Sequence, residues 1–172
     1  MKIKIFALTH KKFEVPQDKM YQPLQVGREE KEDLGYLCDN TGDNISAENC
    51  YYSELTGLYW IWKNVHTYKY VGTCHYRRYL LNEQEKIFTE AEYLELLKDY
   101  DLITTKRVVL NNSYHYGFAT NHNIHALDMT GEVIKELYPE YYDTFVQLVN
   151  GTETYFGNMI VTSKKWFDTY LS

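Results

Sequence analysis

The stretch YVGTCHYRRYLL, residues 70–81, begins as a strand and ends in a polar cluster. Its first five residues are apolar or small, which is typical of a buried strand. The strand then runs into His75, Arg77 and Arg78, which are interleaved with tyrosines. Because ligands bind at the carboxyl ends of strands in open α/β sheets, this stretch predicts both a strand of the sheet and the position of a binding site.

The orientation of this cluster depends on how far the strand extends, because side chains alternate along a strand. If the strand continues to Tyr79, then His75, Arg77 and Tyr79 share one face. Tyr76 and Arg78 then share the other face, and one arginine faces a ligand while the second pairs with a carboxylate or braces a loop. The guanidinium fork matches phosphate oxygens, so a nucleotide diphosphate would explain the cluster. A structural ion-pair site at the strand end is the equal alternative.

The composition indicates a folded chain in a reducing compartment. A chain of 172 residues, 44% of them hydrophobic, can bury a core and is not disordered. Its three cysteines form no CxxC pair, and the charged start MKIKIFALTH is unlike a signal peptide. We therefore expect a cytoplasmic protein. No apolar run reaches the roughly 20 residues that span a bilayer, so membrane contact would be peripheral, at the inner face.

The charge pattern favours a small anionic ligand over a nucleic acid. The net charge is −6, whereas nucleic-acid-binding domains usually carry a basic face. The basic residues form short clusters at Lys11–Lys12, Arg77–Arg78 and Lys106–Arg107. Local positive clusters in an acidic chain suit a compact anion.

Hydrophobic patterns along the chain alternate between strand and helix. Strands are predicted at residues 3–8, 20–27, 70–79, 100–105 and 155–162, and helices at 53–65, 90–97, 123–149 with a break at Pro139, and 163–171. Pro23 places the second strand toward an edge of the sheet. The alternation predicts one α/β layered domain with a mostly parallel sheet.

Three of these helices have distinctive features. In helix 53–65 the apolar spacing predicts a buried face made by Leu55, Leu58, Tyr59, Trp62 and Val65. The TEAE sequence at residues 89–92 is a capping box. Ser163 is a predicted cap for the last helix, whose buried face would hold Trp166, Phe167 and Tyr170.

Other candidate residues give weaker signals. Thr9, His10 and Lys11 follow the first strand, where nucleotide-binding α/β domains place ligand contacts, although a surface Lys pair is usually only solvated. Residues 28–50 form a long polar loop, and such loops are usually functional. Within it, Asp43 and Asn44 belong to TGDN, which also suits a plain turn.

The histidine spacing argues against a zinc site, and the missing short motifs argue against an ATPase, a dehydrogenase and a hydrolase. His115, His122 and His125 lack a cysteine or acidic partner at zinc-site spacing, so no metal site is predicted. There is no P-loop, no dinucleotide fingerprint and no nucleophile elbow.

Six stretches together resemble a bacterial glycosyltransferase family from capsule and exopolysaccharide gene clusters that was long described only as a domain of unknown function. The stretches are IKIFALTHKKFEVP, YQPLQVG, EDLGYLCDNTGDNIS, NCYYSELTGLYWIWKN, YVGTCHYRRY and GNMIVTSKKWFDTYL. They follow in order, and the match runs from Lys2 to the last residue. The resemblance implies a single GT-A-like domain over residues 1–172, with galactofuranosyltransferases among its relatives. Such relatives continue beyond the final helix, so we expect a chain shortened at its C-terminus.

The resemblance also assigns roles to residues. GT-A enzymes usually place a metal-binding DxD motif where this chain has HYRRY, so cationic side chains would neutralise the donor diphosphate without a required metal, Mn or Mg being the alternative. Asp128 and His122, with His125 as an alternative, are the candidate catalytic bases. The residues expected to bind the UDP-sugar are Thr9, His10, Lys11, Asp43, Asn44, Glu54, His75, Tyr76, Arg77, Arg78 and Asn158.

The resemblance therefore implies transfer of a sugar, with galactofuranose as a candidate, from a UDP-sugar to a lipid-linked oligosaccharide in capsular or exopolysaccharide synthesis. The alternative is a non-catalytic nucleotide- or carbohydrate-binding module. The two differ in turnover, because only the enzyme would slowly hydrolyse or transfer the donor sugar.

Overall fold

The computed structural model describes residues 2–172, which form two compact units. The first unit contains the chain up to Thr105 together with Asn158–Ser172, and the second contains Lys106–Gly157. The sequence predicts a single domain over this length. The segment between the two parts of the first unit gathers into a compact unit of its own and pairs with no strand of the main sheet, and the single GT-A-like domain stays a prediction.

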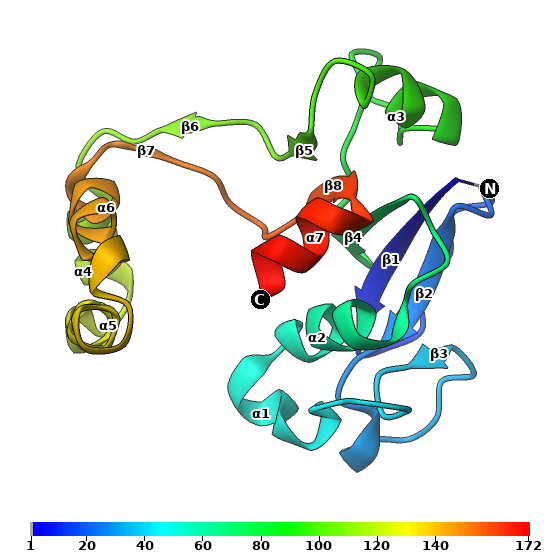
Figure 1. The fold of residues 1–172 in the computed structure, drawn as a ribbon, viewed down its shortest axis with the longest axis horizontal. Coiled ribbons are helices and arrows are strands. Elements are labelled where there is room, and N and C mark those ends of the chain that lie inside the picture. Colours follow the sequence, from blue (N-terminus) through cyan, green and yellow to red (C-terminus); the bar gives the residue numbers. More distant parts are fainter. Residues whose placement is uncertain (1) are drawn as a thin grey trace. The chain divides into compact units, whose positions relative to one another are not determined.

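A six-stranded sheet forms the centre of the first unit (Figure 1). Its order is β3-β2-β1-β4-β8-β5. The strands are β1 (Ile3–Thr9), β2 (Tyr21–Gln25), β3 (Leu37–Cys38), β4 (Tyr70–His75), β5 (Leu102–Thr104) and β8 (Ile160–Ser163). The first four in the order are parallel, whereas β8 is antiparallel to both β4 and β5. The predicted α/β class with a mostly parallel sheet is confirmed.

Helices cover both faces of this sheet because β1 is apolar on both sides. On one face Ile5 and Ala7 pack with Tyr93 of α3 (Glu90–Leu96). On the other face Phe6 and Leu8 pack with α2 (Leu55–Asn64) and α7 (Lys164–Leu171). The helices of this unit are α1 (Asn49–Tyr52), α2 (Leu55–Asn64), α3 (Glu90–Leu96) and α7 (Lys164–Leu171), with two 3₁₀ turns, η1 (Arg28–Glu30) and η2 (Ser46–Glu48).

Pro23 does not place β2 at the edge of the sheet, contrary to the sequence prediction. Strand β2 lies between β1 and β3. However, β3 pairs only with Leu24 and Gln25, so Pro23 precedes the part of β2 that β3 covers. The short outer strand therefore leaves room for a residue that cannot donate a backbone hydrogen bond.

The buried face of α2 matches the predicted one only in part. Leu58 and Val65 are buried as predicted, but Leu55 is exposed, and Trp60 and Ile61 also enter the core. The sequence pattern missed part of this face because it includes Gly57, which has no side chain to count. A Cβ on Gly57 would lie 2.7 Å from Val26 Cγ1 and 2.8 Å from Leu8 Cδ2, so glycine permits the close approach of helix and sheet.

Both predicted helix caps are confirmed, but the predicted face of α7 is only partly correct. The Thr89–Glu92 capping box forms, and the Ser163 hydroxyl accepts a hydrogen bond from the Trp166 amide. Phe167 is fully buried, whereas Trp166 and Tyr170 are exposed. The helix therefore contacts the core along a narrower stripe than its aromatic residues indicate.

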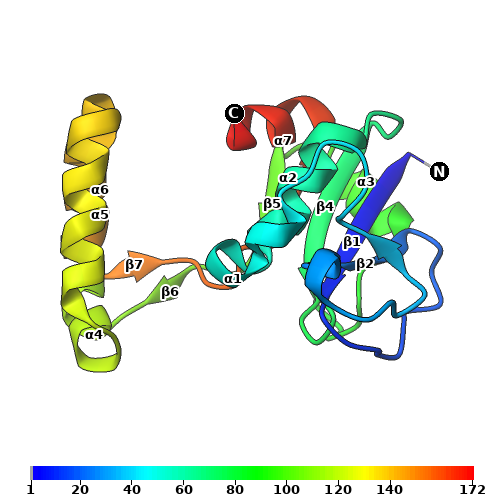
Figure 2. The ribbon, with the colours of Figure 1, turned by 90° about the horizontal axis from the view of Figure 1, so that it is seen from below.

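The second unit consists of three helices and a two-stranded ribbon (Figures 1 and 2). These elements are β6 (Val108–Val109), α4 (Tyr114–Asn121), α5 (Ile124–Leu137), α6 (Pro139–Asn150) and β7 (Glu153–Thr154). The predicted break at Pro139 is confirmed, since α6 begins there. Gly131 of α5 lies against Phe145 of α6, where an added Cβ would be 2.9 Å from the ring. No helix within residues 2–172 is both long and apolar enough to cross a membrane.

Candidate functional site

The strand β4 ends at His75 in a tight turn and does not continue to Tyr79. The Arg78 amide donates to the His75 carbonyl at 3.0 Å, and the His75 amide donates to the Arg78 carbonyl at 3.1 Å. The Tyr76 amide donates to the Leu8 carbonyl of β1 at 3.1 Å. The prediction that side chains alternate from His75 to Tyr79 is therefore wrong. The residues after His75 lie in a turn, and the side chains of a turn do not alternate between the two faces of a sheet. Arg77 and Arg78 line the same pocket.

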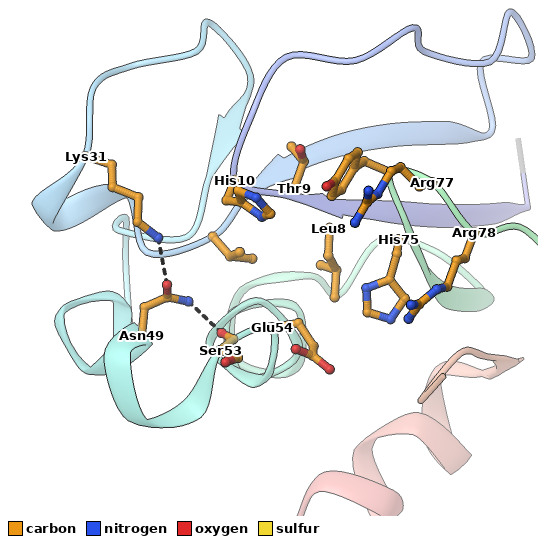
Figure 3. Close-up of a pocket in the computed structure, with 12 residues that line it drawn as sticks. Leu8, Thr9, His10, Lys31, Asn49, Ser53, Glu54, His75, Arg77 and Arg78 are labelled. Atoms are coloured by element: carbon orange, nitrogen blue, oxygen red, sulfur yellow. Dashed lines mark hydrogen bonds between the residues drawn. The ribbon is translucent and has the colours of Figure 1, made fainter. Parts of the chain in front are cut away.

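This pocket is a cavity of about 350 Å³ at the carboxyl ends of β1 and β4 (Figure 3). Its volume is within the range of small-molecule sites, about 300–1,000 Å³. Asn49, Ser53 and Glu54, which precede α2, and Lys31 of the long polar loop supply the opposite wall. The lining residues are Leu8, Thr9, His10, Val26, Lys31, Asn49, Ser53, Glu54, His75, Tyr76, Arg77 and Arg78.

The pocket is rich in nitrogen-bearing cationic groups although the chain is acidic. Lys31, Arg77 and Arg78 line it with His10 and His75, and Glu54 is the sole carboxylate among the lining residues. Within residues 2–172 neither arginine forms an ion pair with a carboxylate, so the alternative of a structural ion-pair site finds no partner there.

Tyr76 orders the cationic side chains around it. The Arg77 guanidinium lies 4.9 Å from the centroid of its ring, and Lys11 Nζ lies 5.2 Å from it. The His10 ring meets the same tyrosine edge-on at 5.3 Å. These contacts hold positive groups next to the pocket without neutralising them.

His10 reports the positive potential of the pocket. Partial burial lowers its pKa, and the charges of Lys11, Lys31 and Arg77 lower it further. All three charged neighbours are cations. The site therefore disfavours an additional positive charge and favours an anion.

Thr9 supports the pocket through the backbone. Its hydroxyl is buried, accepts from the Lys11 amide at 3.1 Å and donates to the Lys11 carbonyl at 2.5 Å. These bonds turn the chain at the end of β1 and point His10 into the cavity (Figure 3).

Several predicted binding residues lie outside this pocket. Asp43 accepts from the Tyr59 hydroxyl, and Asn44 bonds to the Gly42 carbonyl and the Ser46 amide. Asn158, with φ 42°, accepts from the Tyr170 hydroxyl at 3.3 Å. Lys11 contacts Tyr76 but is not a lining residue. The structure thus gives these side chains partners of their own within the fold.

The two candidate catalytic residues belong to the second unit. Asp128 Oδ1 lies 3.6 Å from His115 Nε2, and His122 packs on Phe118 with ring centroids 4.8 Å apart. His122 also lines a cavity of about 260 Å³ within that unit. Neither residue lines the pocket of the first unit.

The sequence analysis missed the buried Asp39, whose carboxylate organises the loop behind the pocket. It accepts from the Gly27 and Arg28 amides and from the Ser46 and Thr56 hydroxyls. A buried carboxylate that accepts several hydrogen bonds has no sequence motif. Here the sequence shows only an acidic residue directly after the apolar pair Leu37–Cys38. Lys31 and Asn49 were missed as well, because each is a single polar residue in a polar loop.

The donor set of the pocket fits an anion better than a divalent cation. Mg and Mn prefer oxygen ligands, and Glu54 supplies the only carboxylate. Within residues 2–172, no group of three or more His, Cys, Asp or Glu side chains could hold a metal ion. The lining residues therefore offer a divalent cation few oxygen ligands of their own.

Comparison with known families covers almost the whole chain. The family described as a domain of unknown function, DUF4422, matches residues 4–172. The chain belongs to this family. This DUF4422 chain matches none of the curated proteins.

A solved structure connects the DUF4422 fold with glycosyl transfer. The apo structure of WbbM, described as a bifunctional glycosyltransferase, is 29% identical and superposes with a TM-score of 0.84. The match covers 99% of this chain and 35% of the WbbM chain. The DUF4422 chain is thus similar to about a third of a glycosyltransferase.

Proposed function

We propose that this chain is a glycosyltransferase domain that uses a UDP-sugar as its donor. The observation that carries the proposal is the pocket in which Arg77 and Arg78 lie beside Lys31 and two histidines at the ends of β1 and β4. A nucleotide diphosphate has the charge and the size for this cavity. The similarity to WbbM over nearly the full chain supports the same assignment.

In this proposal the arginines neutralise the diphosphate. When the bond between sugar and phosphate breaks, negative charge develops on the leaving UDP. Fixed guanidinium groups, which do not reorganise during the reaction, stabilise that charge and would replace a required metal. An Mn or Mg ion bound together with the donor is the alternative.

The remaining assignments come from the resemblance described above. The acceptor is a lipid-linked oligosaccharide of capsular or exopolysaccharide synthesis, made at the inner face of the membrane in the cytoplasm. Galactofuranose is the candidate sugar. Asp128 or His122 is the candidate base for the acceptor hydroxyl.

A thermal-shift screen with UDP and UDP-sugars, each with and without manganese, tests this function. A ligand that binds only the folded state raises the melting temperature according to its affinity. We expect a shift with UDP in the absence of manganese and a larger one with the matching UDP-sugar. Loss of every shift in a chelator, with recovery in manganese, would contradict the metal-independent site.

Turnover separates the enzyme from a binding module. With the UDP-sugar that gives the largest shift, release of free UDP over hours indicates an enzyme. Binding with no release of UDP, in the presence of oligosaccharide acceptors, would instead identify a non-catalytic module.

A further inference from the structure

A chain of hydrogen bonds connects the pocket to the buried Asp39. Lys31 Nζ donates to Asn49 Oδ1 at 2.8 Å. Asn49 Nδ2 donates to Thr56 Oγ1 at 3.1 Å, and Thr56 Oγ1 donates to Asp39 Oδ2 at 2.7 Å. Lys31 and Asn49 both line the pocket, whereas Thr56 and Asp39 are fully buried.

Every bond in this chain points the same way. Each donor faces the Asp39 carboxylate, so the negative charge of Asp39 polarises Thr56, which polarises the Asn49 amide in turn. The Asn49 Oδ1 atom is then a stronger hydrogen-bond acceptor for the ammonium group of Lys31. Within residues 2–172, Lys31 forms no ion pair with a carboxylate, and its contact with Asn49 is therefore the one that fixes its head group.

Close packing holds the Asn49 amide in a single position. It also donates to the Ser53 carbonyl at 2.6 Å, the bond that Figure 3 draws beside the Lys31 contact. On its other side lies Gly27, with φ 64°, where an added Cβ would come within 2.4 Å of Asn49 Cγ. An amide clamped in this way gives a flexible lysine a defined location.

We propose that Lys31 binds the anionic part of the ligand and that Asn49 is the positioning residue that holds its ammonium group at the pocket. The anion is the diphosphate of the donor nucleotide, so this part of the inference rests on the proposed function. The placement of Lys31 by Asn49 is a property of the protein alone.

The first experiment measures that placement without a ligand. Histidine resonances followed by NMR give the pKa of His10, which the charge of Lys31 lowers. Lys31→Met removes the charge and should raise the pKa of His10. Asn49→Ala keeps the charge but releases the ammonium group, so it should raise the pKa of His10 in the same direction.

Controls make this result specific. Lys12→Met removes a neighbouring exposed lysine that does not line the pocket and should leave the pKa of His10 unchanged. Asn49→Leu preserves volume and provides a second variant if Asn49→Ala does not fold. A wild-type pKa of His10 in a folded Asn49 variant, beside a raised value in Lys31→Met, would overturn the positioning role.

The second experiment measures UDP binding by calorimetry in a double-mutant cycle. Lys31→Met should weaken binding about tenfold, as for loss of a hydrogen bond to a charged group. Asn49→Ala should weaken it less, and the double variant should bind no more weakly than Lys31→Met alone. Additive losses would show that Asn49 acts independently of Lys31.

The NMR titration and the calorimetry test the role of Lys31 and Asn49 separately from the proposed function. If wild-type protein binds no UDP, the proposed function fails while the His10 measurement still decides the positioning role. If UDP binds and Lys31→Met binds it equally well, the ligand role of Lys31 is wrong and the proposed function stands.

Discussion

His75 and Arg78 bond to each other through both of their backbone amide and carbonyl groups, at 3.0 and 3.1 Å. This reciprocal pair closes the turn that ends β4. It places two consecutive arginines at one rim of one pocket, which a continuing strand would have separated onto opposite faces. The backbone therefore concentrates positive charge at the end of the sheet.

Replacing either arginine should weaken ligand binding without unfolding the protein. In the proposed site each arginine would make charge-assisted contacts to the diphosphate, worth about 1.5–3 kcal/mol, so Arg77→Met and Arg78→Met should each weaken UDP binding about tenfold or more. Neither pairs with a carboxylate within residues 2–172, so the free energy of unfolding should change by less than about 0.5 kcal/mol. Calorimetry and urea unfolding measure the two quantities.

Arg107→Met is the matched control for the arginine variants. Arg107 is exposed, pairs with Glu153 in the second unit at 3.0 Å and is not among the lining residues of the pocket. It should leave UDP affinity unchanged. Wild-type affinity in the Arg77→Met/Arg78→Met double variant would refute the anion site.

Donor binding should tighten as the pH falls. The pKa of His10 in the folded protein is below its usual value of about 6.5, because of burial and the charges of Lys11, Lys31 and Arg77. A bound diphosphate favours the protonated His10 ring, so His10 takes up a proton when a UDP-sugar binds. The affinity for the UDP-sugar therefore rises as the pH drops below about 6.5. His10→Gln should flatten this dependence in calorimetry.

The stability of the unliganded protein should show the opposite trend. Between the lowered pKa of folded His10 and the unfolded value, the unfolded chain binds more protons. The stabilisation by neutral His10 is therefore present above about pH 6.5 and is lost as the pH falls toward the folded pKa. Urea unfolding of wild type and His10→Gln across this range measures it, and parallel curves would contradict the assignment.

Asp39→Ala should destabilise the fold strongly. The carboxylate is fully buried, and its loss leaves two backbone amides and the Ser46 hydroxyl without an acceptor, while the Thr56 hydroxyl keeps only the Ser53 carbonyl. We expect a loss of about 3–5 kcal/mol in the free energy of unfolding. Asp99→Ala, at an exposed residue, should change it by less than about 0.5 kcal/mol. Similar values for the two variants would show that the Asp39 hub is dispensable.

Two glycine-to-alanine variants should change stability in opposite directions. Gly57→Ala forces a methyl group against Val26 and Leu8 and should cost about 1–3 kcal/mol. Gly117→Ala lies within α4, where an added Cβ meets no atom within 4 Å, so the better helix propensity of alanine should stabilise by about 0.5–1 kcal/mol. Thermal unfolding measures both, and a stabilising Gly57→Ala would contradict the close packing of α2.

Much of the fold could be predicted because its central strands are short apolar runs. Ile3–Thr9 is such a run, and capping residues such as Thr89 and Ser163 marked the start of helices. The turn at His75–Arg78 could not be predicted, since it contains neither glycine nor proline. The strand order β4-β8-β5 could not be predicted either, because no short sequence motif marks antiparallel pairing between distant segments.

The candidate site was predicted where it depends on one continuous stretch and missed where it depends on distant contacts. His75 to Arg78 were identified together from the end of a strand. Lys31 and Asn49 enter the pocket only because the long loop folds around Asp39, and no spacing rule relates these three positions.

The antiparallel pairing of β5 with β8 places Thr104 opposite Ile160, so the chain leaves the first unit and re-enters it at adjacent positions. Topologically, Lys106–Gly157 is therefore the loop of one hairpin. A short Asn-Gly turn could join the two strands after excision of that segment. The segment is thus a cassette that protein engineers could delete, or exchange between relatives, without altering the strands that carry the arginine pocket.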